Sequence, residues 1–325
     1  MKSQKENWAG ESNYHPDATN YFNQALAGKV LHHAYLLHGR SGLGKFAFAS
    51  ALAKKIICSD MASESEKRCL AAVDNLSHPE FWLVKSETEN QAISVEEIKA
   101  MRERLLRSSL GGSVYKVAVV DQAHNLTQAA ANAILKILEE PPKNTIIILV
   151  SSLPEKILPT IKSRTQLVKF NRAARGGIEK NIKSRAGDKA GIIASLAAGR
   201  PKVAEGLLDN KESLDELLAL RKRLLGLLEK EPGQRLIDKM AAGKREPAEL
   251  QSETEDLVYV LHDQLISAAG LSSKYLVNPF VGQISAKPTS LSNLRRAGQD
   301  YLHFNELLKT NANRDLVYEN IFLNL

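Results

Sequence analysis

Apolar residues along the first half of the chain follow two different spacings. Short apolar runs with the length of buried strands lie at 33–37, 81–84, 115–120 and 145–150. Between them, residues 18–29, 45–57, 93–110 and 127–140 carry apolar side chains at intervals of three and four, which is typical of amphipathic helices. Repeated β and α segments of this kind predict an α/β domain with a parallel sheet and helices on both faces.

Helix end signals support these boundaries. Ser94 and Glu97 have the spacing of a capping box, Thr127 is an N-cap, and Pro141 and Pro142 end the helix that follows it. The polar stretch 59–68 separates two of the predicted elements, and we expect it to interrupt the pattern.

The second half of the chain differs in character, because strand-like runs almost vanish after Phe170. Glycine-rich breaks flank a small helical unit, and long helices are predicted at 212–230, 249–270 and 292–310. We therefore predict three parts: an α/β domain at 1–170, a helical lid at 171–207, and a helical domain at 208–325.

Composition sets broad limits on function. The chain has 325 residues, of which 43% are hydrophobic and 25% charged, as in ordinary globular proteins. No apolar run approaches the roughly 20 residues that span a membrane, and the polar N-terminus lacks a signal sequence, so we expect no membrane partner and a cytoplasmic location. A net charge of +7 favours an anionic partner. Basic residues of the predicted helices are either solvated faces or a DNA-facing surface, namely Lys54, Lys55, Arg102, Arg104 and Arg107.

The chain has two cysteines, Cys58 and Cys69. In a reducing compartment we expect them to be free thiols, because two cysteines do not make a disulfide framework.

A glycine loop follows the first predicted strand, in "LLHGRSGLGKFAFASALAKKI". Gly39, Gly42 and Gly44 allow backbone N–H groups to curl around phosphates, and Lys45 can reach the outer phosphates. The phosphate-loop pattern requires Ser or Thr after the lysine to hold Mg²⁺, but this chain has Phe46. The loop is therefore either a residual nucleotide site or a tight turn kept for packing, and efficient hydrolysis is not expected.

Asp121 ends the buried strand in "VAVVDQAH". In nucleotide hydrolases of this layout the strand ends in Asp-Glu, with Asp for Mg²⁺ and Glu to activate water. Here Gln122 replaces the glutamate, and an amide cannot act as a carboxylate base. A second catalytic element is thus lost independently of the first.

Several segments together resemble a known family. "GKVLHHAYLLHGRSGLGK", "HPEFWLV", "YKVAVVDQAHNLTQAAANAILKILEEPP", "PEKILPTIKSRTQLVKF" and "NANRDLVYENIFL" occur in the order and approximate spacing of bacterial clamp-loader subunits of DNA polymerase III. The chain looks like a member of the delta-prime family, and the segment "AAANAILKILEEPP" is especially specific for delta-prime and gamma/tau subunits. The likeness spans nearly the whole chain and is weakest between about 209 and 300.

The resemblance implies an AAA+ fold whose C-terminal helices form a collar in an open ring of five subunits. Delta-prime members are commonly poor or inactive ATPases, which fits Phe46 and Gln122. The expected partners are gamma/tau and delta clamp-loader subunits, with the sliding clamp and primed DNA reached through the complex. No cofactor is required, and the sequence leaves open whether ATP or ADP binds.

Arg164, in "IKSRT", matches the arginine of the family's Ser-Arg-Cys element, with Thr165 in place of the cysteine. The resemblance implies an arginine finger that completes the ATP site of the neighbouring subunit in trans, a role that suits a planar, permanently charged guanidinium. The alternative is an arginine that caps or pairs at a helix end.

Two further departures concern the family's lid and its zinc module. Val203 occupies the slot of a lid arginine that senses the γ-phosphate, with Arg200 as the alternative residue. The zinc module needs four ligands, whereas this span offers Cys58, Cys69 and His78 without a C-x₂-C pair, so zinc is not expected.

The leading hypothesis is a non-catalytic clamp-loader subunit of the DNA polymerase III holoenzyme. An active AAA+ clamp-loader ATPase of the gamma/tau kind is the enzyme alternative, and Phe46, Gln122 and Val203 argue against it. A third hypothesis is a free-standing AAA-like regulator that binds DNA alone.

Overall fold

A computed structural model describes residues 14–58, 61, 63–86, 91–107, 114–228, 230, 247–272, 275–278 and 299. The chain divides into two compact units, Met1–Asn181 with Gly199–Lys202, and Ile182–Ala198 with Val203–Leu325. The three predicted domain boundaries stay predictions. The predicted helix at 292–310 and the closing segment 311–323 lie outside the described residues, apart from residue 299.

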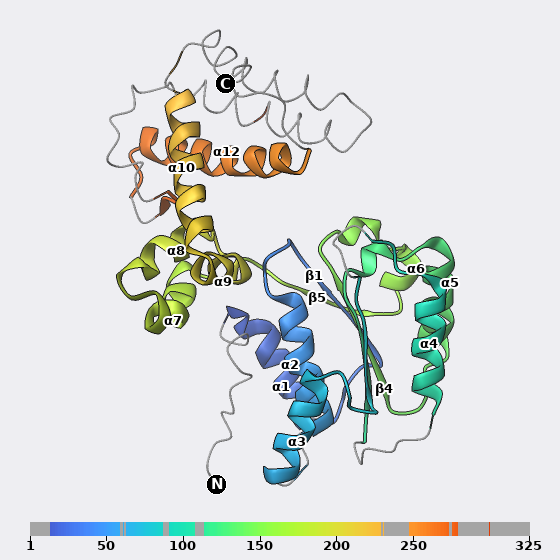
Figure 1. The fold of residues 1–325 in the computed structure, drawn as a ribbon. Coiled ribbons are helices and arrows are strands. Elements are labelled where there is room, and N and C mark those ends of the chain that lie inside the picture. Colours follow the sequence, from blue (N-terminus) through green and yellow to red (C-terminus); the bar gives the residue numbers. More distant parts are fainter. Residues whose placement is uncertain are drawn as a thin grey trace. The chain divides into compact units, whose positions relative to one another are not determined.

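The first unit is built on a five-stranded parallel sheet with the strand order β2-β3-β4-β1-β5, which confirms the predicted α/β class (Figure 1). The strands are β1 (Ala34–His38), β2 (Phe81–Val84), β3 (Lys116–Val120), β4 (Thr145–Ser151) and β5 (Gln166–Lys169). Every residue of β4 is buried, as expected for a central strand covered on both faces.

Helices cover both faces of this sheet, so successive strand residues enter two separate cores. Tyr35 and Leu37 pack in one core, while Ala34 and Leu36 pack in the other. The first core is closed by α1 (Pro16–Ala27), α2 (Lys45–Cys58) and α3 (Ser63–Asp74), and the second by α4 (Val95–Leu106), α5 (Gln128–Glu139) and α6 (Pro159–Lys162).

The predicted helix ends are confirmed at two positions. The backbone N–H of Glu97 donates to the Ser94 hydroxyl, and the Glu97 carboxylate accepts from the Ser94 backbone, which completes the capping box before α4. The Thr127 hydroxyl accepts from the Ala130 N–H at the start of α5.

Helix α3 and strand β5 are among the elements that were not predicted. Helix α3 occupies most of the polar stretch, where Cys69 and Val73 supply a narrow buried stripe against α2. Strand β5 is short, mostly exposed and paired on one side only, with β1, so its apolar signal is weak. In both elements tertiary packing stabilises a segment whose own hydrophobic pattern is faint.

The described residues of the second unit are mainly helical, as predicted, and they include a buried charge. Helices α7 (Arg175–Ala186) and α9 (Pro201–Asp209) extend over the boundary between the units, while α8 (Ala190–Leu196), α10 (Lys211–Leu228) and α12 (Pro247–Ala268) lie wholly in the second. The guanidinium of Arg221 is fully buried, donates to Asp256 at 2.8 and 3.0 Å, and also donates to Asn278 and to the Leu196 carbonyl. It therefore ties α8, α10 and α12 together.

Candidate functional site

The glycine loop lies at the carboxyl edge of the sheet, directly after β1. Strand β1 lies between β4 and β5, so the chain leaves β1 toward one side of the sheet and leaves β4 toward the other. Doubly wound sheets bind their ligands at the carboxyl ends of the strands, beside such a reversal. Gly39 has a φ of 146°, and a Cβ added there would lie 2.4 Å from the Phe170 carbonyl oxygen. Only glycine fits this turn, so part of the motif is required for packing alone.

Lys45 begins α2 and points back into the loop. Its side chain is buried, and its ammonium donates to the Arg40 carbonyl at 2.7 Å and to the Ser152 hydroxyl at 3.0 Å. Burial lowers the pKa of Lys45 to about 8, although the nearby Asp121 carboxylate opposes the shift. The lysine that would reach phosphates thus holds the loop's own backbone.

Two further contacts hold the loop from outside. His15, immediately before α1, lies with Nε2 2.6 Å from the Leu43 carbonyl oxygen, so Nε2 carries the hydrogen. The backbone N–H of Lys202, at the start of α9, donates to the Gly42 carbonyl at 3.0 Å. Burial lowers the pKa of His15, and the nearby Lys45 acts in the same direction. A neutral imidazole is therefore favoured at this contact.

Asp121 follows β3 and faces the same edge, as predicted from its position. Burial raises the pKa of its carboxyl, against the effects of the Gln122 N–H, Lys85 and Lys45. The Gln122 N–H donates to Asp121 Oδ1 at 2.9 Å, and its backbone adopts the left-handed conformation with a φ of 50°. The Gln122 side-chain oxygen accepts from Asn125 and is part of this turn.

The Phe46 ring contacts a cationic side chain and offers no oxygen ligand to a metal ion. Its ring packs against the first core, and the Lys85 ammonium lies 5.1 Å from the ring centroid. Lys85 also acts electrostatically on Asp121. A magnesium ion here would lack the hydroxyl ligand that the phosphate-loop pattern supplies, so the residues present fit Mg²⁺ less well than that pattern does.

Arg164 lies just after α6 and is held at the surface by three partners. Its guanidinium donates to Glu139 at 2.9 Å, to the Thr160 carbonyl at 3.1 Å and to the Ser163 hydroxyl at 3.4 Å. Thr165, which replaces the family's cysteine, is buried, with its hydroxyl 3.1 Å from the Ile161 carbonyl oxygen. The Thr165 hydroxyl thus has its hydrogen-bond partner within α6, and the neighbouring Arg164 side chain stays 37% exposed.

The arginine and the glycine loop lie at opposite edges of the sheet. Arg164 precedes β5, whereas Lys45 follows β1, and Tyr35 to His38 of β1 pair in parallel with Gln166 to Lys169 of β5. Four strand residues separate the edges by roughly 13 Å, at about 3.3 Å per residue. The structure brings Lys45 and Asp121 together and keeps Arg164 apart from them.

Comparison with known proteins finds relatives among the subunits of DNA polymerase III. A family profile described as DNA polymerase III, delta subunit, matches residues 14–174. The delta' subunit of DNA polymerase III from Pseudomonas aeruginosa is 35% identical over 144 residues, which are 43% of this chain and 43% of that protein. The chain is thus similar to subunits of DNA polymerase III, delta-prime subunits among them, and the matching profile covers just under half of it. All the residues of the candidate site except Lys202 lie within the matched segment.

One other relative extends the likeness beyond that segment. The tau subunit of Bacillus subtilis is 30% identical over 284 residues, covering 78% of this chain and 49% of that protein. A gamma subunit-related protein from Thermotoga maritima superposes with a TM-score of 0.44 at 19% identity, over 93% of this chain and 96% of that one. The chain spans about half the length, or less, of the curated relatives that it matches.

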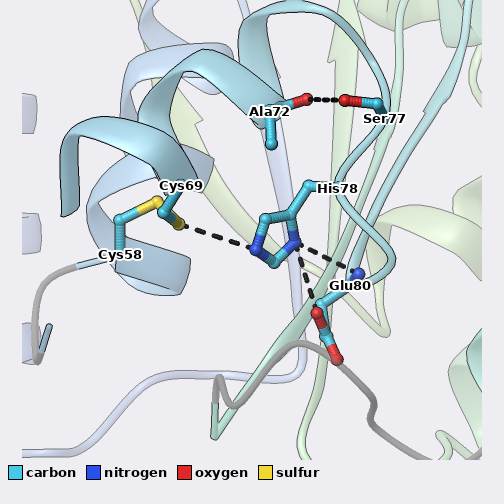
Figure 2. The surroundings of a disulfide bond; sticks show 6 residues. All are labelled: Cys58, Cys69, Ala72, Ser77, His78 and Glu80. Atoms are coloured by element: carbon cyan, nitrogen blue, oxygen red, sulfur yellow. Dashed lines mark hydrogen bonds and ion pairs between the residues drawn. A yellow bond between two sulfur atoms is a disulfide. The ribbon is translucent and has the colours of Figure 1, made fainter. Parts of the chain in front are cut away.

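The two cysteines correct one prediction. Cys58 and Cys69 form a disulfide and are not free thiols (Figure 2). The prediction relied on compartment chemistry, whereas packing α3 against the end of α2 places the two side chains together. Oxidised cysteines offer no thiolate to a metal, and the described residues contain no group of three or more His, Cys, Asp or Glu side chains that could hold one.

Other expectations concern membranes and surface charge. None of the helices in the described ranges is long and apolar enough to cross a membrane. Among the basic residues, Lys54 pairs with Asp74, and the Arg104 guanidinium lies 4.8 Å from the centre of the Trp82 ring. These two side chains have structural partners, which favours the solvated-face interpretation for them.

Sequence reasoning missed several residues of the site. Lys85 directly follows β2, so the carboxyl-edge rule could have placed it. His15, Ser152 and Glu139 reach their partners through packing between elements far apart in the chain. No sequence pattern available here marks those pairings.

Proposed function

We propose that this chain is a delta-prime subunit without ATPase activity of its own. In this proposal it is a cytoplasmic component of the DNA polymerase III clamp loader and helps load the sliding clamp onto primed DNA. It lends Arg164 to the ATP site of a neighbouring gamma/tau subunit, and its C-terminal helices provide the assembly surface.

The observation that carries the proposal is the separation of Arg164 from the chain's own glycine loop. An arginine at the amino edge of the sheet cannot reach a ligand held at the carboxyl edge of the same sheet. It can act only on a ligand carried by another molecule. Its half-exposed position and its partly solvated ion pair allow the guanidinium to exchange Glu139 for phosphate oxygens at small cost.

The chain's own glycine loop supports the non-catalytic part. Lys45 is engaged by Arg40 and Ser152, Phe46 offers no oxygen, and Gln122 offers no carboxylate. Binding of ATP or ADP without hydrolysis remains compatible with the glycines and the lysine. Hydrolysis would lack both the metal ligand and the base.

The experiment is steady-state ATP turnover by a loader reconstituted with gamma/tau and delta subunits, stimulated by clamp and primed DNA. Arg164→Ala should lower turnover at the one affected site by roughly 10³-fold, and Arg164→Lys should restore little, because an ammonium lacks the planar fork. Arg68→Ala, on the exposed face of α3, is the matched control. Unchanged turnover in an Arg164→Ala ring that assembles normally would refute the trans role.

A second candidate function is an active gamma/tau-like ATPase, favoured by the coverage of the tau relative over 78% of this chain. It predicts Mg²⁺-dependent turnover by the purified chain alone, abolished in Lys45→Ala. Absence of such turnover, together with stimulation of partner subunits, distinguishes the two candidates.

A further inference from the structure

The disulfide between Cys58 and Cys69 lies beside two other buried chemical groups. Cys58 is the last residue of α2, Cys69 lies in α3, and His78 and Glu80 precede β2 (Figure 2). The exposed fractions of these four residues are 1%, 5%, 7% and 2%, respectively. Buried imidazole and carboxyl groups are costly unless their polar atoms are paired, so their place next to the sulfurs calls for an explanation.

His78 is aimed at one sulfur. Its Nε2 lies 3.6 Å from Cys69 Sγ, while its Nδ1 accepts a hydrogen bond from the Glu80 N–H at 3.2 Å. Since Nδ1 is an acceptor, the hydrogen of the neutral ring sits on Nε2 and points to the sulfur. Burial lowers the pKa of His78, and the Glu80 carboxylate, 3.3 Å from Nδ1, opposes that shift. The hydrogen bond from the Glu80 N–H therefore orients the neutral ring.

We propose that Cys58 and Cys69 form a reversible redox site in which Cys69 is the exchanging thiol and His78 is its positioning residue. The N–H of His78 stabilises the Cys69 thiolate, and thiolates are the reactive form of cysteine. No corresponding donor to Cys58 is found among the described contacts. The partner chemistry is a small disulfide such as oxidised glutathione.

The exchange balances in two steps. The Cys69 thiolate attacks the small disulfide, forms a mixed S–S bond and releases one thiolate, which takes up a proton. Cys58 then loses its proton and attacks Cys69 Sγ, which forms the Cys58–Cys69 bond and releases the second thiol. Two electrons pass from the two cysteines to the small disulfide, and the reverse sequence opens the bond.

The disulfide controls how firmly α3 is attached to α2, the helix that follows the glycine loop. Helix α2 begins at Lys45 and ends at Cys58, so the disulfide fastens its far end to α3. After reduction, the Lys54–Asp74 ion pair and the buried contacts of Val73 still join the two helices. Reduction therefore loosens α3 without removing it, and this holds whether or not the chain is a clamp-loader subunit.

The test uses the full-length chain in glutathione buffers of varied ratio, with thiol trapping and intact mass as the readout. Wild type should convert between a dithiol and an internal disulfide. Cys58→Ser should stop at a glutathione mixed disulfide on Cys69, and Cys69→Ser should react about 10-fold more slowly, because its remaining thiol lacks the imidazole. Hydrogen exchange should be faster in α3 of the reduced form.

His78 is tested by two substitutions in the Cys58→Ser background. His78→Asn keeps an acceptor for the Glu80 N–H but loses the donor to sulfur, so the pH profile of Cys69 alkylation should move up toward that of free cysteine, about 8.5. His78→Gln places an amide donor near the Nε2 position and should partly restore the lower profile. Among the described groups, Glu80 acts electrostatically on His78, and it is unchanged in these variants.

Three outcomes would overturn the inference. One is equal thiol reactivity in Cys58→Ser and Cys69→Ser. Another is an unchanged pH profile in His78→Asn that folds normally by circular dichroism. The third is stoichiometric zinc in the reduced wild type, which would make the cysteines metal ligands. If His78→Asn does not fold, the comparison of the two cysteine variants still decides which thiol exchanges.

Discussion

Nη2 of Arg164 lies 2.9 Å from Oε1 of Glu139, and this ion pair joins the end of α6 to the end of α5. The side chains are 37% and 50% exposed, so solvent screens the pair, and it contributes less than about 1 kcal/mol to stability. The Thr160 carbonyl holds the same guanidinium independently. Glu139 thus orients the arginine without fixing it.

The first prediction concerns Glu139→Gln. The melting temperature should fall by less than about 4 °C, since a screened pair of this kind is weak. In the reconstituted loader this variant should keep most of the ATP turnover that Arg164→Ala loses. A Glu139→Gln ring as impaired as the Arg164→Ala ring would mean that the carboxylate itself acts at the neighbouring site.

The second prediction concerns Gly39→Ala. The added Cβ would meet the Phe170 carbonyl at 2.4 Å in a backbone conformation that alanine rarely adopts, so we expect a loss of about 2–4 kcal/mol of stability. Gly206→Ala in α9 is the control, because a Cβ there has open space and should be neutral or stabilising by up to about 1 kcal/mol. Denaturant titration followed by circular dichroism compares them. Equal stability of the two variants would contradict the packing role of Gly39.

The strands and caps of the first unit could be predicted because their signals are local. β4 is buried along its whole length, and Ser94 and Thr127 cap the helices that begin beside them. Helix α3 and strand β5 could not, because each is stabilised mainly by neighbours distant in sequence. An edge strand and a mostly polar helix carry too few apolar residues for the sequence pattern to predict them.

The candidate site was predictable where the sheet rule applies and not elsewhere. Lys45 and Asp121 follow parallel strands, so their meeting at one edge follows from topology. The contact of His15 with Leu43 depends on how α1 packs, which sequence does not state. The pairing of Cys58 with Cys69 depends on helix α3, whose mostly polar residues do not predict a helix beside the end of α2.

The third prediction follows from the lowered pKa of Lys45. In the folded chain this pKa is about 8 instead of 10.5, so the unfolded chain binds more protons between these values. The penalty for the buried ammonium is present in full below pH 8. It diminishes by about 1.4 kcal/mol for each pH unit from there up to 10.5.

Lys45→Met should therefore change the pH dependence of stability. The free energy of unfolding of the variant relative to wild type should stay nearly constant up to about pH 8 and decrease from there to pH 9.5, because only wild type gains stability as Lys45 deprotonates. Lys55→Met, on the same helix, provides the control. A difference that is constant with pH would show that Lys45 titrates normally.

The last prediction concerns the buried charge of the second unit. Arg221→Ala removes both hydrogen bonds to Asp256 and leaves a buried carboxylate without its cation, which should cost about 3–5 kcal/mol. Glu216→Ala, at an exposed position of α10, should change stability by less than about 0.5 kcal/mol. Hydrogen exchange localises the effect, with faster exchange expected in α8, α10 and α12 while β3 and β4 keep their protection.

Adding Asp256→Ala to Arg221→Ala should recover part of the loss, because the unpaired carboxylate is then gone. No recovery in the double variant would mean that the lost contacts with Asn278 and the Leu196 carbonyl, and not the Asp256 charge, dominate the cost.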